Sequence, residues 1–216
     1  VAAPTSSLPE AIGGPRNWDY RYTWIRDASY TVYALHRLQL FPEAAGFLSS
    51  VLDVADRHGR PPVLYDLDGN QPPPEREDPE LEGYRGSRPV RWGNAAADQV
   101  QHDVYGEIVD VAFQWSSRHG SIDPILWNRL LRLVEAAAEK WHLPDRGIWE
   151  VRTSARPFTY SAAICQVALD RAVRLARRYR LPGNVDRWNA VADQIVETIL
   201  RDAWDPEIQS LVQHIG

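Results

Sequence analysis

Six stretches of the chain carry apolar residues at the three- and four-residue spacing of one helix face, and this repeat constrains the fold more than any other feature. A chain of 216 residues with 44% hydrophobic content supplies enough apolar side chains for a sizeable core. The sequence therefore predicts an all-α fold. The six predicted helices cover residues 24–38, 42–58, 98–118, 124–141, 160–180 and 185–204.

Residues at the ends of these stretches favour the same boundaries. Pro42 and Pro124 stand at first helical positions, where a missing backbone N–H costs nothing. Asp123 and Asn184 are placed to cap the helices that follow them. Gly120 is placed to end the third helix.

The links between the predicted helices alternate between short and long, which indicates helical hairpins. Residues 60–95 form a loop too long to be a simple connector, with a short strand entering a turn at 63–70. A second non-helical stretch covers residues 142–158, and the tail at 210–215 is predicted to be extended. The long loops meet at one end of the helices, so we expect the functional site there.

The charge and the cysteine count exclude several classes of partner and site. With a formal net charge of −5, the chain lacks the basic surface that nucleic acids and anionic membranes attract, so we expect a neutral ligand. Cys165 is the single cysteine, which excludes an internal disulfide and a cysteine zinc site. Histidine spacing and glycine motifs indicate no metal and no cofactor. With no apolar run of membrane-spanning length, we expect a cytoplasmic protein.

The stretch NWDYRYTWIRDASY at residues 17–30 alternates aromatic rings with charges. Arg26 and Asp27 follow Trp24 at the start of a predicted helix. Charged side chains that bond hydroxyls, next to rings that stack on an apolar sugar face, are typical of a sugar site. A structural salt bridge under a tryptophan is the alternative, and the residues alone leave both open.

Two further segments carry carboxylates. Glu150 in GIWEVR has bulky apolar neighbours that would raise its pKa and favour a neutral proton donor, whereas in an extended segment Arg152 would lie on the same side and lower that pKa. From these residues alone, a surface glutamate paired with Arg152 is the favoured interpretation. In DQVQHDVYGE, we expect Gln99, Asp103 and Glu107 to share a helix face. A solvated face is the favoured interpretation of that set, ahead of an acid and base pair.

Three phrases in this order and at these separations, SLPEAIGGPRNWDYRYTWIRDASYTVYAL, DQVQHDVYGE and GIWEVR, resemble glycoside hydrolase family 15, the glucoamylase-like enzymes of bacteria. The resemblance covers residues 1–216. It implies an (α/α)6 toroid of helical hairpins and an inverting, exo-acting hydrolysis of α-glucosidic bonds that releases glucose from non-reducing ends of α-glucans.

The resemblance also implies roles for six residues. Glu150 matches the general acid that protonates the leaving glycosidic oxygen, and Trp149 matches the ring beside it. Arg26 and Asp27 match the pair that grips hydroxyls of the terminal glucose. Aromatic walls of the same subsite are matched by Tyr20 and Trp24.

Two departures from the family pattern limit what the chain can do. Fungal members carry a second glutamate after the acid, and Val151 stands there in this chain, which puts binding at the next subsite in doubt. The catalytic base of the family lies downstream of the residues matched here. We therefore expect residues 1–216 to be about half of a toroid, with no second domain. Such a piece should be nearly inactive, and its apolar seam should favour self-association.

Three other functions remain open. A trehalase, which cleaves the α,α-1,1 bond between two glucoses, would use the same Arg26, Asp27 and Glu150. A carbohydrate-binding or structural helical module would need no catalysis. A lyase acting on acidic sugars would call for a more basic cleft.

Overall fold

The computed structural model describes residues 1–119 and 122–216, and in this part of the chain it contains six α-helices. They confirm the predicted all-α fold, whereas the predicted helix end at Gly120 lies outside the described residues. Within the described ranges, no helix is both long and apolar enough to cross a bilayer. The helices are α1 (Ile25–Arg37), α2 (Phe41–Arg57), α3 (Asp103–His119), α4 (Pro124–Lys140), α5 (Thr159–Tyr179) and α6 (Val185–Asp202).

Short antiparallel strand pairs fold the connections. The strand at 64–65 confirms the predicted strand before a turn, and the strand at 210–211 confirms the extended tail. The pairs are β1 (Leu8–Pro9) with β2 (Asn17–Trp18), β3 (Thr23–Trp24) with β4 (Leu64–Tyr65), β5 (Arg76–Asp78) with β6 (Val90–Trp92), and β7 (Trp204–Asp205) with β8 (Ser210–Leu211). Two 3₁₀ turns, η1 (Tyr84–Gly86) and η2 (Ala95–Asp98), complete the loop before α3.

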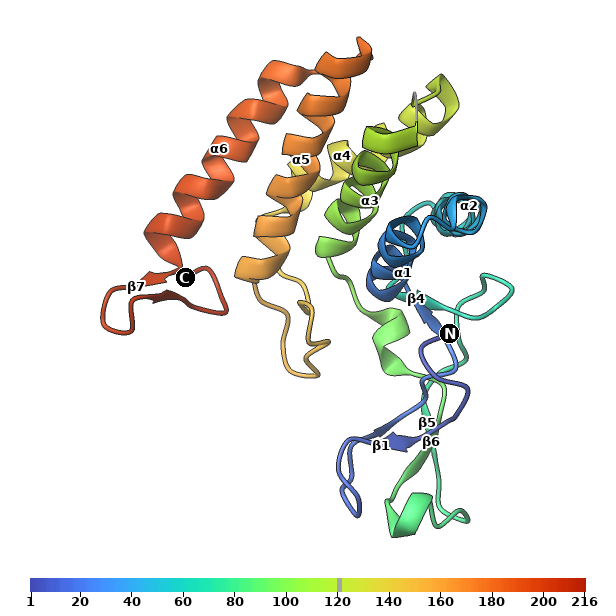
Figure 1. Ribbon diagram of the computed structural model, residues 1–216. Coiled ribbons are helices and arrows are strands. Elements are labelled where there is room, and N and C mark those ends of the chain that lie inside the picture. The colour runs from blue at the N-terminus through green and yellow to red at the C-terminus, as the bar shows by residue number, and fades with distance from the viewer. Residues whose placement is uncertain (120–121) are drawn as a thin grey trace.

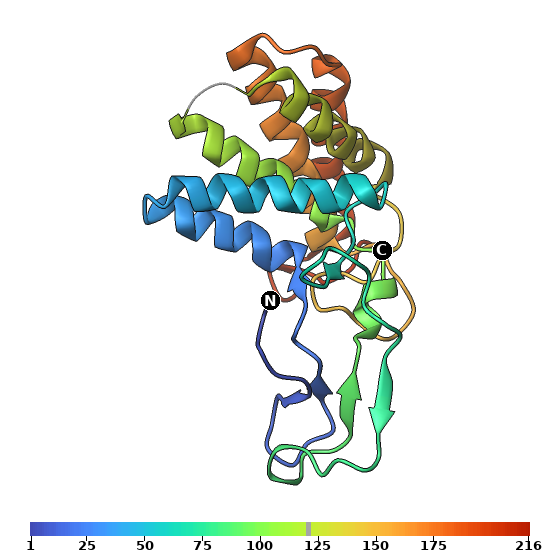
Figure 2. The same cartoon turned by 90° about the vertical axis from the view of Figure 1, so that its right-hand side faces the viewer.

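The helices form a curved double layer. One layer is the row α1, α3, α5, in which α3 packs against both neighbours; α2, α4 and α6 cover this row from outside (Figure 1). The long connections and the short strands gather at one end of the helices (Figures 1 and 2). This placement confirms the expectation drawn from the alternating link lengths.

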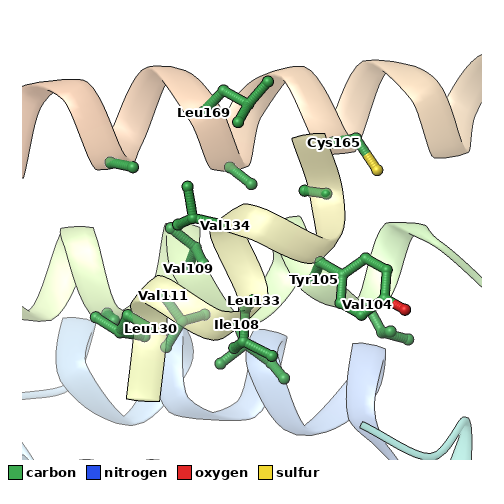
Figure 3. Packing of buried hydrophobic residues seen from close by; sticks show 14 of the residues in the cluster. Val104, Tyr105, Ile108, Val109, Val111, Leu130, Leu133, Val134, Cys165 and Leu169 are labelled. Atoms are coloured by element: carbon green, nitrogen blue, oxygen red, sulfur yellow. The ribbon is translucent and has the colours of Figure 1, made fainter. Parts of the chain in front are cut away.

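The core lies between the two layers. Buried side chains of α3, α4 and α5 belong to one cluster there, and Figure 3 draws Ile108 on α3, Leu130 on α4 and Leu169 on α5 among them. The helices α3 and α5 approach closely at Gly106, where an added Cβ would lie 2.0 Å from the backbone oxygen of Ile164. The glycine is therefore a packing requirement of this helix pair.

Two of the predicted helix caps are present, and one boundary was wrong. Side chains of Asp123 and Asn184 accept hydrogen bonds from backbone N–H groups three residues on, as predicted. The third helix begins at Asp103 and not at residue 98. The reason is that Asn94 caps a separate turn, η2, after which Gln99 is extended.

Candidate active site

The start of α1 places the predicted sugar-binding pair. Trp24 pairs with Leu64 across β3 and β4 and is buried, so its indole has a fixed position. Arg26 and Asp27 follow in the first turn of α1. Arg26 Nη1 donates to the backbone oxygen of Ile148 at 3.0 Å, and Arg26 Nη2 lies 3.3 Å from Asp27 Oδ2.

A tight turn presents Glu150 to the same place. Buried Asp145 accepts hydrogen bonds from the backbone N–H groups of His102 and Gly147, which fastens the turn to the start of α3. Gly147 has φ +62°, and an added Cβ would lie 2.7 Å from the ring of Phe158. Glu150 itself has φ +53°, a left-handed conformation that costs a non-glycine residue about 1 kcal/mol. Such strain is typical of functional positions.

The carboxylate of Glu150 contacts two of the other predicted site residues. Trp24 Nε1 donates to Glu150 Oε1 at 2.7 Å, and Arg26 Nη2 lies 3.6 Å from the same oxygen. The side chain is 21% exposed. Burial raises the pKa of Glu150 above its usual range, while Arg26 and the Trp24 N–H oppose that rise. This direction agrees with the one expected from burial, although Trp149, one of the apolar neighbours, is itself 76% exposed.

The favoured pairing of Glu150 with Arg152 was wrong. Residues 147–150 form a turn and not an extended segment, and among the described residues no ion pair joins these two side chains. Arg152 instead makes two hydrogen bonds of 2.7 Å to Glu75.

All six predicted site residues line one cavity of about 810 Å³. It opens at the loop end of the helices, where the site was expected. The structure thus brings together Tyr20, Trp24, Arg26, Asp27, Trp149 and Glu150.

The expected solvated face of helix three was wrong. Asp103 is fully buried, Glu107 is also buried and accepts a hydrogen bond from Tyr160 Oη at 2.7 Å, and neither lines the cavity. Burial and the nearby carboxylate of Asp145 raise the pKa of Asp103 to about 7. Gln99 is off the helix and donates to the backbone oxygen of Glu150 at 3.2 Å, so it helps to position that residue.

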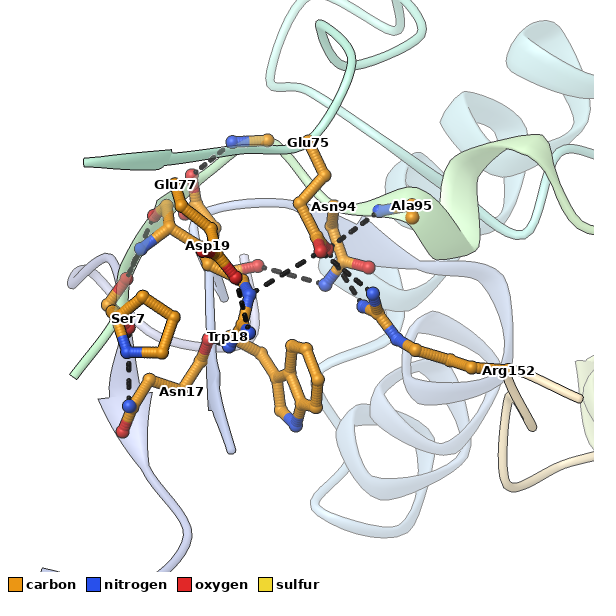
Figure 4. A network of polar contacts seen from close by, with 12 residues as sticks. Ser7, Asn17, Trp18, Asp19, Glu75, Glu77, Asn94, Ala95 and Arg152 are labelled. Atoms are coloured by element: carbon orange, nitrogen blue, oxygen red, sulfur yellow. Dashed lines mark hydrogen bonds and ion pairs between the residues drawn. The ribbon is translucent and has the colours of Figure 1, made fainter. Parts of the chain in front are cut away.

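Several residues at the site were missed. Trp18 and Arg152 line the cavity, and Glu75 holds Arg152 from behind (Figure 4). Buried Asp19 binds Arg21 through both carboxylate oxygens, at 2.9 and 2.7 Å, and accepts from the backbone N–H of Gly93. Glu75 is 77 residues from Arg152, and Gly93 is 74 residues from Asp19, so no local pattern indicates these contacts. The one local signal was the density of aromatic and charged residues around 17–30.

Comparison with known proteins adds the family. The sequence matches Glycosyl hydrolases family 15 over residues 1–214. The chain belongs to this family. A solved chain named "Glycosidase Wild Type" superposes with a TM-score of 0.66 at 20% identity, covering 100% of this chain and 54% of its own length. That likeness supports the predicted fold, an (α/α)6 toroid of which this family 15 chain supplies a part.

Curated family 15 relatives match most of the chain. A protein named trehalase from Thermoplasma acidophilum is 41% identical over 216 residues, which is 100% of this chain and 37% of the relative. A trehalase from Mycobacterium tuberculosis is 43% identical over 209 residues, 95% of this chain and 31% of the relative. The chain thus spans roughly a third of each relative. Their names favour the trehalase alternative over the expected α-glucan hydrolase.

Proposed function

We propose that the protein carrying this chain hydrolyses α,α-trehalose to two glucose molecules with inversion at the attacked carbon. The observation that carries the proposal is that relatives 40–43% identical over 95–100% of this chain are named trehalase. The cavity supports it, because a largely buried glutamate, an arginine–aspartate pair and aromatic rings line one pocket.

Glu150 acts as the general acid. Burial favours its protonated form, so it can donate a proton to the oxygen that joins the two glucose units. The Trp24 N–H, 2.7 Å away, and the guanidinium of Arg26 then stabilise the carboxylate that remains. The Trp24 N–H and the Arg26 guanidinium therefore need no rearrangement to stabilise the negative charge that Glu150 acquires when it gives up its proton.

Arg26 and Asp27 hold the glucose whose anomeric carbon is attacked by water. Arg26 is fixed by its hydrogen bond to Ile148 and its ion pair with Asp27, so its orientation is set before the sugar arrives. A planar guanidinium and a carboxylate offer paired donors and acceptors to neighbouring hydroxyls. Tyr20, whose ring centroid lies 5.9 Å from that of Trp24, adds an aromatic wall.

Inversion also needs a carboxylate about 6.5–9.5 Å from the acid to activate water. The family resemblance assigns this base to a residue outside 1–216. We therefore propose that the 216-residue chain alone is less active than the full-length protein by at least about 100-fold.

The specificity is tested by measuring glucose release from trehalose, maltose and isomaltose with the full-length protein. Trehalose should be cleaved with the highest kcat/KM, and its first products should be one α- and one β-glucose. Preference for maltose would overturn the trehalase assignment in favour of the α-glucan hydrolase. Binding of these sugars, measured by calorimetry, without any glucose release would favour the carbohydrate-binding module.

A further inference from the structure

The cavity extends past Glu150 to a second polar wall. We define the Trp18–Arg152 wall as Trp18, Glu75, Arg91 and Arg152. Trp18 and Arg152 line the cavity themselves, and the other two residues lie behind them. Figure 4 shows the guanidinium of Arg152 pointing from its loop towards Glu75, with the indole of Trp18 beside it.

The guanidinium of Arg152 is anchored before any ligand binds. Its two hydrogen bonds of 2.7 Å use both oxygens of Glu75, whose side chain is 13% exposed. Glu75 is held in turn by the backbone N–H of Ala95 at 3.1 Å and by Arg91 Nε at 3.5 Å. Burial opposes ionisation of Glu75, but the hydrogen bonds from Arg152 and Ala95 outweigh it and lower the pKa of its carboxyl. Arg152 therefore loses little side-chain freedom when it binds a further group.

This anchoring leaves donors free on the cavity side. A guanidinium has five N–H donors, and Arg152 spends two on Glu75; in the described part of the chain the others have no hydrogen-bond partner. The side chain is 43% exposed and lines the cavity, so these donors are accessible. A neutral polyol that enters the cavity would meet them.

The Trp18 ring stacks against the guanidinium of Arg152. Its ring centroid lies 4.1 Å from Arg152 Cζ and 4.7 Å from Arg91 Cζ. Its Nε1 donates to Glu10 Oε1 at 2.7 Å, which fixes the ring plane. The fixed indole therefore helps to set the plane of the Arg152 guanidinium, whose unused donors suit the hydroxyl rim of a sugar ring.

The Trp18–Arg152 wall and the Arg26–Asp27 pair reach the cavity from different elements of the fold. Arg26, in the first turn of α1, has its Nη2 atom 3.6 Å from Glu150 Oε1. Arg152 follows Glu150 by two residues, and its Cζ atom lies over the ring of Trp18. Glu150 thus shares one cavity with two guanidinium groups that come from different elements of the fold.

We propose that Arg152, oriented by Glu75 and by the stacked ring of Trp18, binds the departing glucose of the substrate, the ring that receives the proton from Glu150. This inference rests on the proposed hydrolysis of trehalose and names its leaving-group site. Fungal members of the family carry a second glutamate at the position of Val151. In this chain Arg152, at the next position, would supply the recognition of sugar hydroxyls that Val151 cannot. The Trp18–Arg152 wall is thereby a specificity determinant for a sugar as leaving group.

The test compares two substrates of the full-length protein that share the attacked glucose. The leaving group of trehalose is a glucose, whereas the leaving group of α-D-glucosyl fluoride is fluoride. Arg152→Gln should lower kcat/KM for trehalose by about 10- to 100-fold, the effect of one lost hydrogen bond to a charged group. The same variant should hydrolyse glucosyl fluoride within about threefold of the wild-type rate.

A matched control and a second variant complete the design. Arg156→Gln changes an exposed arginine of the same loop and should leave both substrates unaffected. Arg152→Lys keeps the positive charge beside Glu75, so it protects the fold if Arg152→Gln unfolds; it should still lose trehalose hydrolysis selectively, because an ammonium lacks the planar fork.

The outcomes separate this inference from the proposed function. A wild-type protein that cleaves neither substrate contradicts the proposed function. A wild-type protein that cleaves both, with folded Arg152 variants that lose both equally or lose neither, overturns the leaving-group site and leaves the hydrolase assignment intact.

Discussion

Replacing Trp24 by phenylalanine should move the alkaline limit of activity to higher pH. A general acid must be protonated, so kcat/KM falls as the pH rises through the pKa of Glu150. Burial already raises that pKa, and the Trp24 N–H opposes the rise by stabilising the ionised form at 2.7 Å. Trp24→Phe keeps a ring in the buried site but removes this donor, so the pKa should rise further.

The magnitude follows from the hydrogen bond that is lost. A hydrogen bond to a charged group contributes about 1.5–3 kcal/mol, and 1.36 kcal/mol corresponds to one pKa unit. Arg26 remains near the carboxylate and water can enter the space left by the indole, so we expect the lower end, a shift of about one unit.

The assay is the pH dependence of kcat/KM for trehalose in the full-length protein. Trp149→Phe is the matched control: the same substitution in the same cavity, at an exposed ring with no hydrogen bond to Glu150 among the described residues. Its alkaline limb should coincide with that of the wild type. A shift of the Trp24→Phe limb to lower pH, or an equal shift in both variants, would refute the reasoning.

Three further predictions concern the packing of α3 against α5, the Arg26–Asp27 pair and the expected apolar seam of the partial toroid. Gly106→Ala should lower the free energy of unfolding by about 2–3 kcal/mol in urea titrations, because its Cβ meets the backbone of α5, whereas Gly46→Ala, with open space around it in α2, should raise it by about 0.5–1 kcal/mol. Equal effects would contradict the close approach of α3 and α5. Arg26→Lys should lower kcat/KM for trehalose about 100-fold, since one ammonium cannot reach Ile148, Asp27 and the sugar together; a loss under threefold would exclude Arg26 from the site. The isolated chain should self-associate through α6, where Leu200 is 60% exposed, and Leu200→Ser should shift sedimentation towards the monomer; an unchanged distribution would exclude this surface.

Much of the fold was predictable because its helices bury one apolar stripe each. The period of 3.6 residues fixed where α4 and α6 lie, and Asp123 and Asn184 marked their starts. The start of α3 was missed because Asn94 caps a competing turn, which the apolar pattern continues through. The close helix contact at Gly106 leaves no trace in the apolar spacing, because it depends on a residue of another helix.

The site was predictable where function is concentrated in short phrases. Arg26, Asp27 and Glu150 could be named because the family phrases carry them, and the structure brings them into one cavity. The partner of Arg152 is 77 residues away in the sequence, so no local pattern reveals it. The burial of Asp103 was likewise hidden, since polar residues at helical spacing normally indicate a solvated face.

The proton donor itself is tested most directly by Glu150→Gln in the full-length protein. The amide keeps the shape of the side chain but cannot transfer a proton, so kcat for trehalose should fall by about 10²- to 10⁴-fold while the protein remains folded. A folded Glu150→Gln protein that hydrolyses trehalose within tenfold of the wild-type rate would contradict the assignment.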